Sequence, residues 1–346
     1  MAEPLLQVQD LHVRFRSEGG DLIAVQGLDL ELGRGEVLGL VGESGSGKSV
    51  SMMAVMGLID APGEVQARRI ALDGVELRSL KPRARRRLLG SKLSMIFQDP
   101  AASLDPCYTI GSQLIESLAA HHAGSTSAHR ARALELLAAA EVPEPAARMQ
   151  AYAHQLSGGL CQRVMIALAL AGEPELLIAD EPTTALDVTI QAQIVDLLRR
   201  LQRERGLSLI LISHDLALVS GVADRVIVMY AGQALEAGPA RTTFASPAHP
   251  YTRALMQALP QGSRGHARLQ ALPGMVPGRA DRPTGCLLAP RCAHAQAECH
   301  TRRPILQALT SGDPAQKLPG PVQQGTPSGQ ARFAACHFAD VTGDGA

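Results

Sequence analysis

The chain has no tryptophan, and its four tyrosines and five phenylalanines make up only 3% of its 346 residues. Stacking of bases or sugars on aromatic side chains is therefore excluded as a general mode of binding. Lysine plus arginine and aspartate plus glutamate both number 33, so the formal net charge is zero. This balance argues against a chain built to coat nucleic acid, which requires an excess of positive charge.

Long apolar segments are also missing from the sequence. No apolar run approaches the length needed to span a bilayer, and the N-terminus lacks the basic-then-apolar layout of a signal peptide. We therefore expect a cytoplasmic chain that acts at a membrane only through a partner. Its 46% apolar and 19% charged residues are typical of a globular protein, and its length is sufficient for two domains.

The most informative stretch matches the phosphate-loop pattern G-x-x-x-x-G-K-[ST]. It reads Gly42, Glu43, Ser44, Gly45, Ser46, Gly47, Lys48 and Ser49. Residues 37–41 before it predict a buried strand, and residues 51–58 after it predict a helix. In this context the loop N–H groups and the helix N-terminus would hold phosphates, Lys48 would reach the outer phosphates and Ser49 would ligate Mg²⁺. A glycine-rich turn that matches by chance is the alternative, and the flanking strand and helix argue against it.

Two carboxylates, Asp180 and Glu181, end a second apolar strand predicted over residues 176–179. The carboxyl end of a buried strand is where an α/β sheet presents its ligands. One carboxylate there can hold Mg²⁺ through water, and the next can orient a water that attacks a phosphate. Acidic residues that cap a neighbouring helix are the alternative. A phosphate loop upstream in the same chain argues against that interpretation.

Polar residues also follow two further predicted strands. Gln98 comes after the strand at residues 93–97, where its amide can reach a metal ion or an attacking water. His214 comes after the very apolar strand at residues 207–212. A glutamine at a strand end is commonly surface, and a histidine beside an apolar strand is commonly a satisfied core residue. Taken alone, these two residues leave both interpretations open.

A second candidate anion site lies before the helix predicted over residues 160–171. Ser157 is a good N-cap for this helix, and Gly158 and Gly159 follow it. A helix N-terminus carries partial positive charge and unpaired N–H groups. One phosphate loop does not need this second terminus to bind a single nucleotide.

The order, types and spacing of these motifs resemble those of the ATP-binding cassette (ABC) ATPases over about the first 245 residues. Residues 99–106, 162–167 and 187–193 resemble the dipeptide/oligopeptide and nickel importer branch in particular. The resemblance implies an α/β fold with a P-loop NTPase core of ABC type, an antiparallel β subdomain and an inserted helical subdomain. The nucleotide-binding domain would cover residues 1–245, with the helical subdomain at about 100–172, and a small loop-rich C-terminal extension would cover residues 246–346.

The family pattern assigns roles to the polar residues when it is carried over to this sequence. It places Mg²⁺ at Asp180, with Ser49 and Gln98, and makes Glu181 the catalytic base. It places the His214 imidazole against the γ-phosphate and gives Gln98 a further part in sensing the membrane partner.

The resemblance also implies a head-to-tail dimer with two ATP molecules at its interface. In the family, the signature of one subunit covers the γ-phosphate that the other subunit's phosphate loop holds. The signature residues here are Ser157, Gly158 and Gly159. Asp187 would lie across the interface, whereas Leu160 and Cys161 depart from the residues usual at their positions. Phe15 is the candidate to stack on adenine, with an ordinary core residue as the alternative.

Four of the six cysteines, Cys286, Cys292, Cys299 and Cys336, lie in the extension. Such clustering in a cytosolic chain indicates metal binding more than disulfides. The segment resembles the C-terminal part of peptide-importer ATPases, some of which are understood to carry a [4Fe–4S] cluster. Zn²⁺ and buried free thiols are the alternatives. Three histidines are spare ligand candidates: His294, His300 and His337.

The sequence therefore predicts the ATP-hydrolysing subunit of an importer for di- or oligopeptides, peripheral to the cytoplasmic face of the inner membrane. Expected partners are a second ABC ATPase subunit, expected to be a paralogue, two transmembrane permease subunits and an extracytoplasmic substrate-binding protein, without nucleic acid. A nickel or other small-solute importer, a soluble ABC ATPase acting on DNA or ribosomes and a nonhydrolytic regulatory module are the alternatives. The basic run at residues 81–87 is interpreted as a solvated helix face rather than a phosphate-binding patch.

Overall fold

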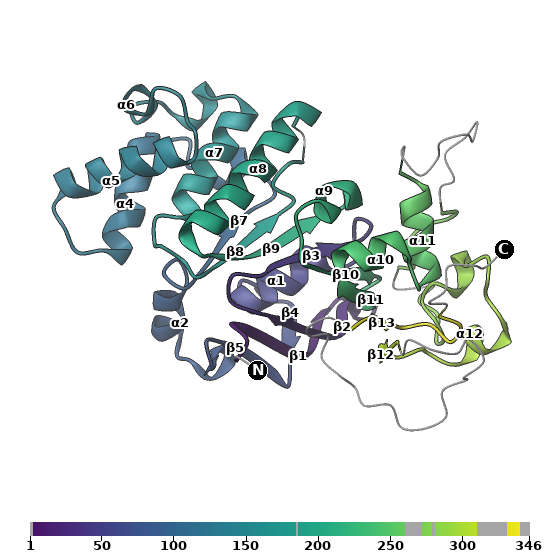
Figure 1. Ribbon diagram of the computed structural model, residues 1–346. Coiled ribbons are helices and arrows are strands. Elements are labelled where there is room, and N and C mark those ends of the chain that lie inside the picture. The colour runs from purple at the N-terminus through teal and green to yellow at the C-terminus, as the bar shows by residue number, and fades with distance from the viewer. Residues whose placement is uncertain (1–2, 185, 260–271, 279–280, 310–330, 340–346) are drawn as a thin grey trace. The chain divides into compact units, whose positions relative to one another are not determined.

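A computed structural model describes residues 3–184, 186–259, 272–278, 281–309 and 331–339 (Figure 1). The chain divides into two compact units. The first unit comprises Met1–Gly33, Val37–Arg78 and Ser213–Ala346, and the second comprises Arg34–Glu36 and Ser79–Ile212. In the part of the chain that the structure describes, no helix is long and apolar enough to cross a membrane.

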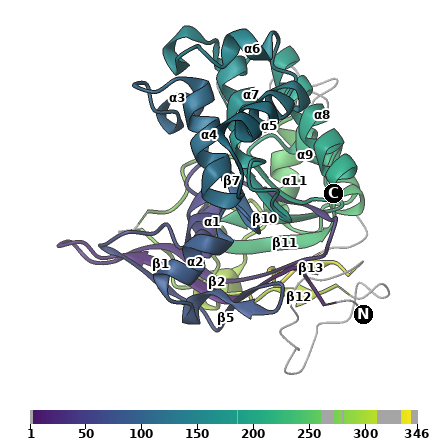
Figure 2. The same cartoon turned by 90° about the vertical axis from the view of Figure 1, so that its left-hand side faces the viewer.

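The first unit contains an antiparallel sheet built on two long strands, β1 (Leu6–Phe15) and β2 (Leu22–Leu32). This pair agrees with the antiparallel β subdomain that the family resemblance implied. Three shorter strands complete the sheet: β4 (Gly63–Gln66) and β5 (Arg69–Leu72), both paired with β1, and β6 (Val75–Glu76), paired with β5. The order is β2-β1-β5-β6, and Figure 2 shows β1, β2 and β5 lying together as one layer. Leu6 and Val8, and then Leu11 and Val13, are buried because successive side chains alternate between faces, and the alternation shifts by one residue at the exposed Asp10, whose φ is 51°.

A second set of strands in the first unit carries the phosphate loop. The strand β3 (Val37–Val41) runs parallel to β10 (Arg225–Tyr230), and all five residues of β3 are buried. The strand β11 (Gln233–Pro239) returns antiparallel to β10 through a turn at Ala231 and Gly232. The C-terminal extension then adds β13 (Phe333–Ala334) to β11, and β12 (Gln307–Ala308) to β13. The sequence analysis did not predict these two strands.

The helices of the first unit are short. The helix α1 (Lys48–Met56) begins directly after the glycine-rich loop, three residues before its predicted start, and ends at Gly57 with a φ of 76°. The others are α9 (Leu216–Ser220), α10 (Ala240–Ala245), α11 (Pro250–Gln257) and α12 (Ala297–Thr301), with a 3₁₀ turn at Ala289–Arg291. The described part of the extension is rich in loops, as the family resemblance implied.

The second unit contains three parallel strands in the order β9-β8-β7. They are β7 (Leu93–Ile96), β8 (Leu176–Asp180) and β9 (Ser208–Ser213), and every residue in them is buried. The long helix α8 (Val188–Arg205) connects β8 to β9 and buries one apolar face, including Ile194, Leu198 and Leu201. Continuous apolar strands of this kind are typical of a parallel sheet covered on both faces.

Helices form most of the rest of the second unit. The bundle comprises α4 (Ile110–His121), α5 (Thr126–Ala139) and α7 (Gly158–Ala169), which contact one another, with α3 (Pro100–Ser103) and α6 (Pro145–Arg148) at its ends. Side chains of Thr109, Ser125 and Ser157 cap the three long helices by accepting backbone N–H groups.

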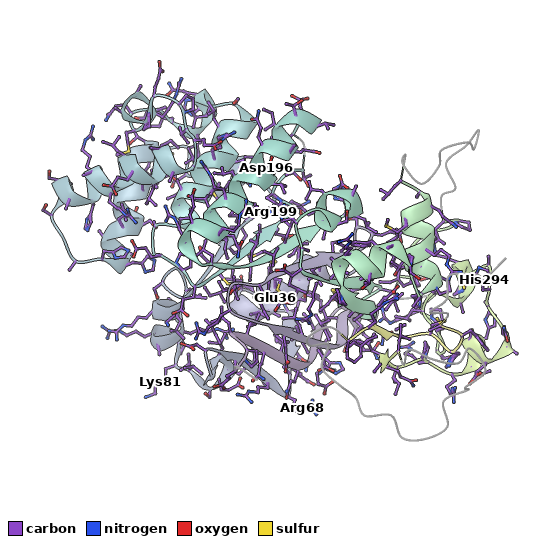
Figure 3. All side chains as sticks on the ribbon, viewed as in Figure 1. Glu36, Arg68, Lys81, Asp196, Arg199 and His294 are labelled. Carbon is purple, nitrogen blue, oxygen red and sulfur yellow. The ribbon has the colours of Figure 1, made fainter. Side chains whose placement is uncertain are left out.

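The basic run lies on the helix α2 (Pro82–Leu88), none of whose residues is buried. Figure 3 shows the Lys81 side chain pointing away from the ribbon at the start of this helix. The predicted solvated helix face agrees with this placement.

Candidate nucleotide-binding site

Three glycines give the phosphate loop its shape in the first unit. The φ angles of Gly42, Gly45 and Gly47 are 148°, 77° and 95°, in the region that side chains disfavour. A Cβ atom at Gly42 would lie 2.1 Å from the Met229 carbonyl oxygen, and one at Gly47 would lie 2.4 Å from the Ala24 carbonyl oxygen. Only glycine therefore fits at these two positions, where the loop passes close to the backbone of β10 and β2.

A buried ammonium group occupies the loop. The Lys48 side chain is 4% exposed, and its Nζ atom donates to the carbonyl oxygens of Gly42 and Glu43 at 2.9 Å each. It also lies 3.3 Å from the Ser46 hydroxyl. No side chain caps the N-terminus of α1, which begins at Lys48. A desolvated positive charge beside an uncapped helix N-terminus is suited to bind phosphate groups.

Neighbouring strands of the same unit hold the loop in place. The Gly232 N–H donates to the Ser46 carbonyl at 3.0 Å, and the Gln26 N–H donates to the Gly232 carbonyl at 2.8 Å. The turn between β10 and β11 therefore links the loop to β2. Phe15 is half-buried at the end of β1, opposite Gly63, and its adenine-stacking role stays a prediction.

The predicted acidic pair lies at the end of β8 in the second unit. Asp180 is 4% exposed, and Glu181 is 9% exposed. Glu181 has a φ of 44°, which is uncommon for a residue with a side chain. Such backbone strain persists where surrounding contacts enforce it, and here the Glu181 N–H donates to the Ile212 carbonyl at 3.0 Å.

The structure brings Gln98 to Glu181, both in the second unit. The Gln98 Nε2 atom donates to Glu181 Oε2 at 3.1 Å, and the Thr184 hydroxyl donates to the same oxygen at 2.9 Å. These two donors fix the orientation of the carboxylate. The sequence analysis missed Thr184, and its position three residues after Glu181 is the signal that could have identified it.

The signature residues lie at an exposed helix N-terminus. Ser157 and Gly158 are exposed, and the Ser157 hydroxyl accepts the Leu160 N–H at 3.4 Å. In contrast, Cys161 is buried, its thiol donates to the Ala153 carbonyl at 3.5 Å, and burial raises its pKa. The unusual residue Cys161 therefore lies in the interior of the second unit rather than at the helix tip.

The remaining predicted residues are also exposed. Asp187 occupies the N-cap position of α8 without a side-chain cap hydrogen bond, and the next residue, Val188, is 80% exposed. A large apolar side chain exposed to this degree is suited to a contact with another chain. His214 follows β9 and is exposed, and Asp215 caps α9 by accepting the Leu218 N–H at 3.1 Å.

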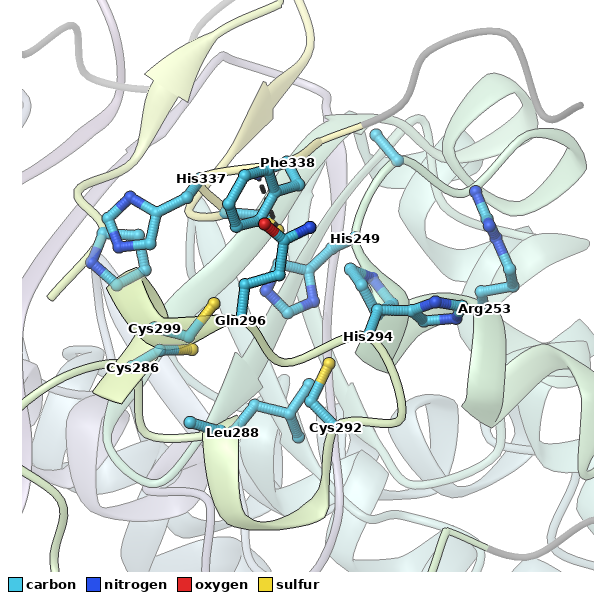
Figure 4. A pocket seen from close by; sticks show the side chains of 15 residues that line it. His249, Arg253, Cys286, Leu288, Cys292, His294, Gln296, Cys299, His337 and Phe338 are labelled. Carbon is cyan, nitrogen blue, oxygen red and sulfur yellow. Dashed lines mark hydrogen bonds between the residues drawn. The ribbon is translucent and has the colours of Figure 1, made fainter. Parts of the chain in front are cut away.

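All four cysteines of the extension line one cavity of about 310 Å³ in the first unit (Figure 4). The Cys286 N–H donates to the Cys299 carbonyl at 2.8 Å, and the Phe338 N–H donates to Cys336 Sγ at 3.4 Å. Burial raises the pKa of Cys286 and Cys292 and raises that of Cys336 to about 11. Within the described residues, no group of three or more histidine, cysteine, aspartate or glutamate side chains is arranged to hold a metal ion.

A histidine that the sequence analysis did not select also lines this cavity. His249 is 1% exposed, and its Nδ1 atom accepts the Tyr251 N–H at 3.0 Å. Burial lowers its pKa to about 4, so the imidazole is neutral at pH 7. Of the predicted spare ligands, His294 and His337 line the cavity, and His300 is not among the lining residues.

Comparisons with known proteins identify matching families along most of the chain. The ABC transporter family matches residues 25–184, and the oligopeptide/dipeptide transporter C-terminal region matches residues 235–299. The dipeptide transport ATP-binding protein DppD of Escherichia coli K12 is 52% identical over 308 residues, covering 89% of this chain and 94% of that protein. DppD of Haemophilus influenzae is 53% identical over 307 residues, covering 89% and 93%.

Solved structures confirm the predicted fold class. The ATP-binding cassette MJ0796, a dimer bound to ADP and Pi in a post-hydrolysis state, matches with a TM-score of 0.62 at 27% identity, covering 68% of this chain and 99% of that one. The cbiO1 protein of Clostridium perfringens, part of the ABC transporter complex cbiONQ, matches with a TM-score of 0.60 at 27% identity, covering 70% and 92%. The fold is therefore that of an ABC ATPase cassette with a C-terminal extension.

Proposed function

The chain belongs to the family of ATP-binding proteins of dipeptide and oligopeptide ABC transporters, and we propose that it hydrolyses ATP to drive peptide uptake through partner membrane subunits. The observation that carries this proposal is the 52% identity with a dipeptide transport ATP-binding protein along 94% of that protein. The loop around Lys48 supplies the buried charge that a nucleotide triphosphate needs.

The residue roles follow from the chemistry of phosphoryl transfer, which depends on positioning and charge neutralisation. The phosphate loop, with Lys48, binds the phosphates of ATP. Ser49, Gln98 and Asp180 would hold Mg²⁺, which neutralises phosphate charge. Glu181 accepts a proton from the attacking water, with its carboxylate oriented by Gln98 and Thr184.

A second cassette completes the site in this proposal. The helix tip at Ser157 and Gly158 covers the γ-phosphate bound by the partner cassette, with Asp187 at the interface. Support comes from the exposure of these residues and of Val188. ATP closes the dimer and hydrolysis reopens it. The partner is a second ABC ATPase subunit, which we propose to be a paralogue.

Residues directly before Gln98 line a pocket in the second unit. An apolar pocket of about 440 Å³ in the second unit is lined by Ser94, Met95, Phe97, Ser103, Met165, Leu168 and Ala169. We propose that it receives an apolar segment of a transmembrane subunit at the cytoplasmic face of the inner membrane. A Phe97→Asp variant should then bind ATP but fail to copurify with the permease subunits.

The decisive experiment is uptake by the assembled importer, with this chain, its partner cassette, two permease subunits and an extracytoplasmic binding protein in proteoliposomes. We expect ATP-dependent uptake of a labelled dipeptide that Lys48→Ala abolishes. Uptake of Ni²⁺ instead of peptide would select the small-solute alternative. ATP hydrolysis by an isolated single chain at full rate, insensitive to Ser157→Ala, would contradict the dimeric mechanism.

We propose that the cysteine cavity binds a [4Fe–4S] cluster through Cys286, Cys292, Cys299 and Cys336, with Zn²⁺ as the alternative. Four thiols around one cavity form a donor set that suits either group, and a bound group would cross-link the extension. The described thiols are not arranged as ligands of a single ion, so binding requires side-chain rearrangement. Iron and acid-labile sulfide should therefore be found after anaerobic purification. Metal-free protein would identify these residues as buried free thiols.

We also propose a domain boundary near residue 245, with the helical subdomain at about 100–172. The match of the C-terminal transporter region to residues 235–299 supports a separate extension. Limited proteolysis that leaves residues 1–245 as a stable fragment would support the boundary.

A further inference from the structure

Arg291, in the C-terminal extension, contacts the phosphate loop directly. Its Nη1 atom lies 2.7 Å from Glu43 Oε2, and its Nη2 atom lies 3.0 Å from Glu43 Oε1. Both residues belong to the first unit, and Glu43 is the second residue of the loop. A bidentate guanidinium–carboxylate pair fixes orientation as well as distance, because two parallel hydrogen bonds must be satisfied together.

The Arg291 side chain has little freedom to move away. It is 6% exposed, and its Nε atom donates to the Pro273 carbonyl at 2.7 Å. Its Nη1 atom lies 3.3 Å from the Tyr230 hydroxyl, and the guanidinium lies 5.6 Å from the centre of the Tyr230 ring. A charge buried in this way depends strongly on its partner, since removal of either leaves an uncompensated charge.

Glu43 is held on three sides. Arg291 holds its carboxylate, the Tyr251 hydroxyl accepts its N–H at 3.0 Å, and Lys48 Nζ donates to its carbonyl at 2.9 Å. Lys48 is thus two hydrogen-bonding steps from Arg291. Residues of the extension and of α11 therefore fix the position of Glu43, whose carbonyl oxygen accepts a hydrogen bond from Lys48.

We propose that Arg291 is a positioning residue for nucleotide binding, which holds the phosphate loop in its binding conformation through Glu43. The inference rests on the proposed function, because it requires residues 42–49 to bind ATP. Loss of the pair should weaken ATP binding more than it slows the chemical step, since Arg291 is paired with a residue of the phosphate loop.

The same arginine connects the loop to the cysteine cavity. Arg291 ends the 3₁₀ turn at Ala289–Arg291, and its N–H donates to the Leu288 carbonyl at 2.8 Å. Leu288 lines the cavity, and so does Cys292, the residue that follows Arg291. A change in the cavity that moves this turn therefore reaches Glu43 through Arg291.

The test measures the ATP dissociation constant, KM and kcat of the assembled importer. Arg291→Ala should raise the dissociation constant and KM roughly tenfold, within the range of coupling between contacting residues, and change kcat less. Arg291→Lys, which keeps the charge without the bidentate geometry, should give an intermediate dissociation constant and KM. This variant keeps the inference testable if Arg291→Ala fails to fold. Glu43→Gln should resemble Arg291→Ala, and the double variant Arg291→Ala/Glu43→Gln should be no worse than either single variant.

A matched control comes from a second buried ion pair, which joins the extension to β11. Arg332 lies 3.1 Å from Glu236, with the two side chains 15% and 0% exposed, and it touches neither Glu43 nor Lys48. Arg332→Ala should lower stability without the tenfold change in KM. Equal KM changes for Arg332→Ala and Arg291→Ala, or additive effects at Arg291 and Glu43, would overturn the proposal.

The cysteine cavity provides a second test of the inference. Cys292→Ser should shift KM for ATP in the wild-type background and not in the Arg291→Ala background. An equal shift in both backgrounds would overturn the connection between cavity and loop. The proposed function has its own test: it fails if the importer with the wild-type chain does not bind ATP, or if Lys48→Ala has no effect. An unchanged KM in Arg291→Ala defeats only the inference about Arg291.

Discussion

The Gln98 side-chain amide donates to the Glu181 carboxylate over 3.1 Å, which joins the ends of two parallel strands in the second unit. The Thr184 hydroxyl donates to the same carboxylate oxygen at 2.9 Å. Glu181 lies at the end of the strand with a φ of 44°, a strained conformation that surrounding contacts must hold. These contacts therefore orient its side chain.

Replacement of the proposed base should separate binding from hydrolysis. Glu181→Gln keeps the size of the side chain and its capacity to accept from Gln98 or Thr184 but removes the group that takes a proton from water. We expect ATP binding close to wild type and a turnover lower by about 10²–10⁴-fold. Fluorescent-nucleotide binding and phosphate release measure the two quantities. Near-normal turnover would refute the assigned role.

The hydroxyl of Thr184 offers a smaller, graded test. Thr184→Val removes one of two hydrogen bonds to Glu181 with little change in volume, so kcat should fall roughly tenfold, as expected for loss of a bond to a charged group. KM should change little because the Thr184 hydroxyl acts on the proposed base Glu181. Thr184→Ser restores the donor and is the control. If the serine variant is as slow as the valine variant, the hydroxyl is not the relevant group.

The sequence predicted those parts of the fold in which local pattern and motif coincide. The buried strand β3, the glycine loop and α1 were predicted together, because apolar residues, glycines and the helix follow one another in a fixed order. Contacts such as Arg291 with Glu43 and the strand pair β11–β13 could not be predicted, because nothing in the local sequence identifies a partner about a hundred or more residues away. The same holds for the site. The sequence identified Gln98 and Glu181 as separate candidates but not the hydrogen bond between them.

Two loop glycines differ in the space around them, which gives a matched pair of variants. At Gly42 an added Cβ would lie 2.1 Å from the Met229 carbonyl, whereas at Gly45 it would meet nothing within 4 Å. Gly45→Ala should therefore cost about 1–2 kcal/mol for its left-handed backbone alone. Gly42→Ala should cost more and abolish ATP binding, since the loop must move. Denaturant unfolding and nucleotide binding report both effects, and equal stability of the two variants contradicts the expectation.

Ser157 is predicted to have two separable roles. As the N-cap of α7 it accepts the Leu160 N–H, so Ser157→Ala should lower the free energy of unfolding by about 1 kcal/mol. Ser157→Asp keeps a capping oxygen and should retain that stability. Its negative charge would, however, repel the phosphate of the partner's nucleotide, so turnover should fall to near zero. Thermal unfolding measures the capping role of Ser157, and ATP hydrolysis measures its role at the nucleotide interface. An active Ser157→Asp variant would remove the signature helix from the proposed nucleotide interface.

Thiol labelling should distinguish the six cysteines by burial. Cys107 is exposed, whereas Cys161 is buried with a raised pKa, and the cavity thiol of Cys336 has a pKa of about 11. Because the thiolate is the reactive species, maleimide at pH 7 should modify Cys107 first. In metal-free protein, labelling of Cys336 should rise with pH as its thiolate fraction increases toward pH 11, whereas a bound metal would keep it protected. Mass spectrometry after timed quenching locates the labels, and a Cys107→Ser variant should show almost no fast phase. Rapid modification of Cys161 in the folded chain would contradict its buried position in α7.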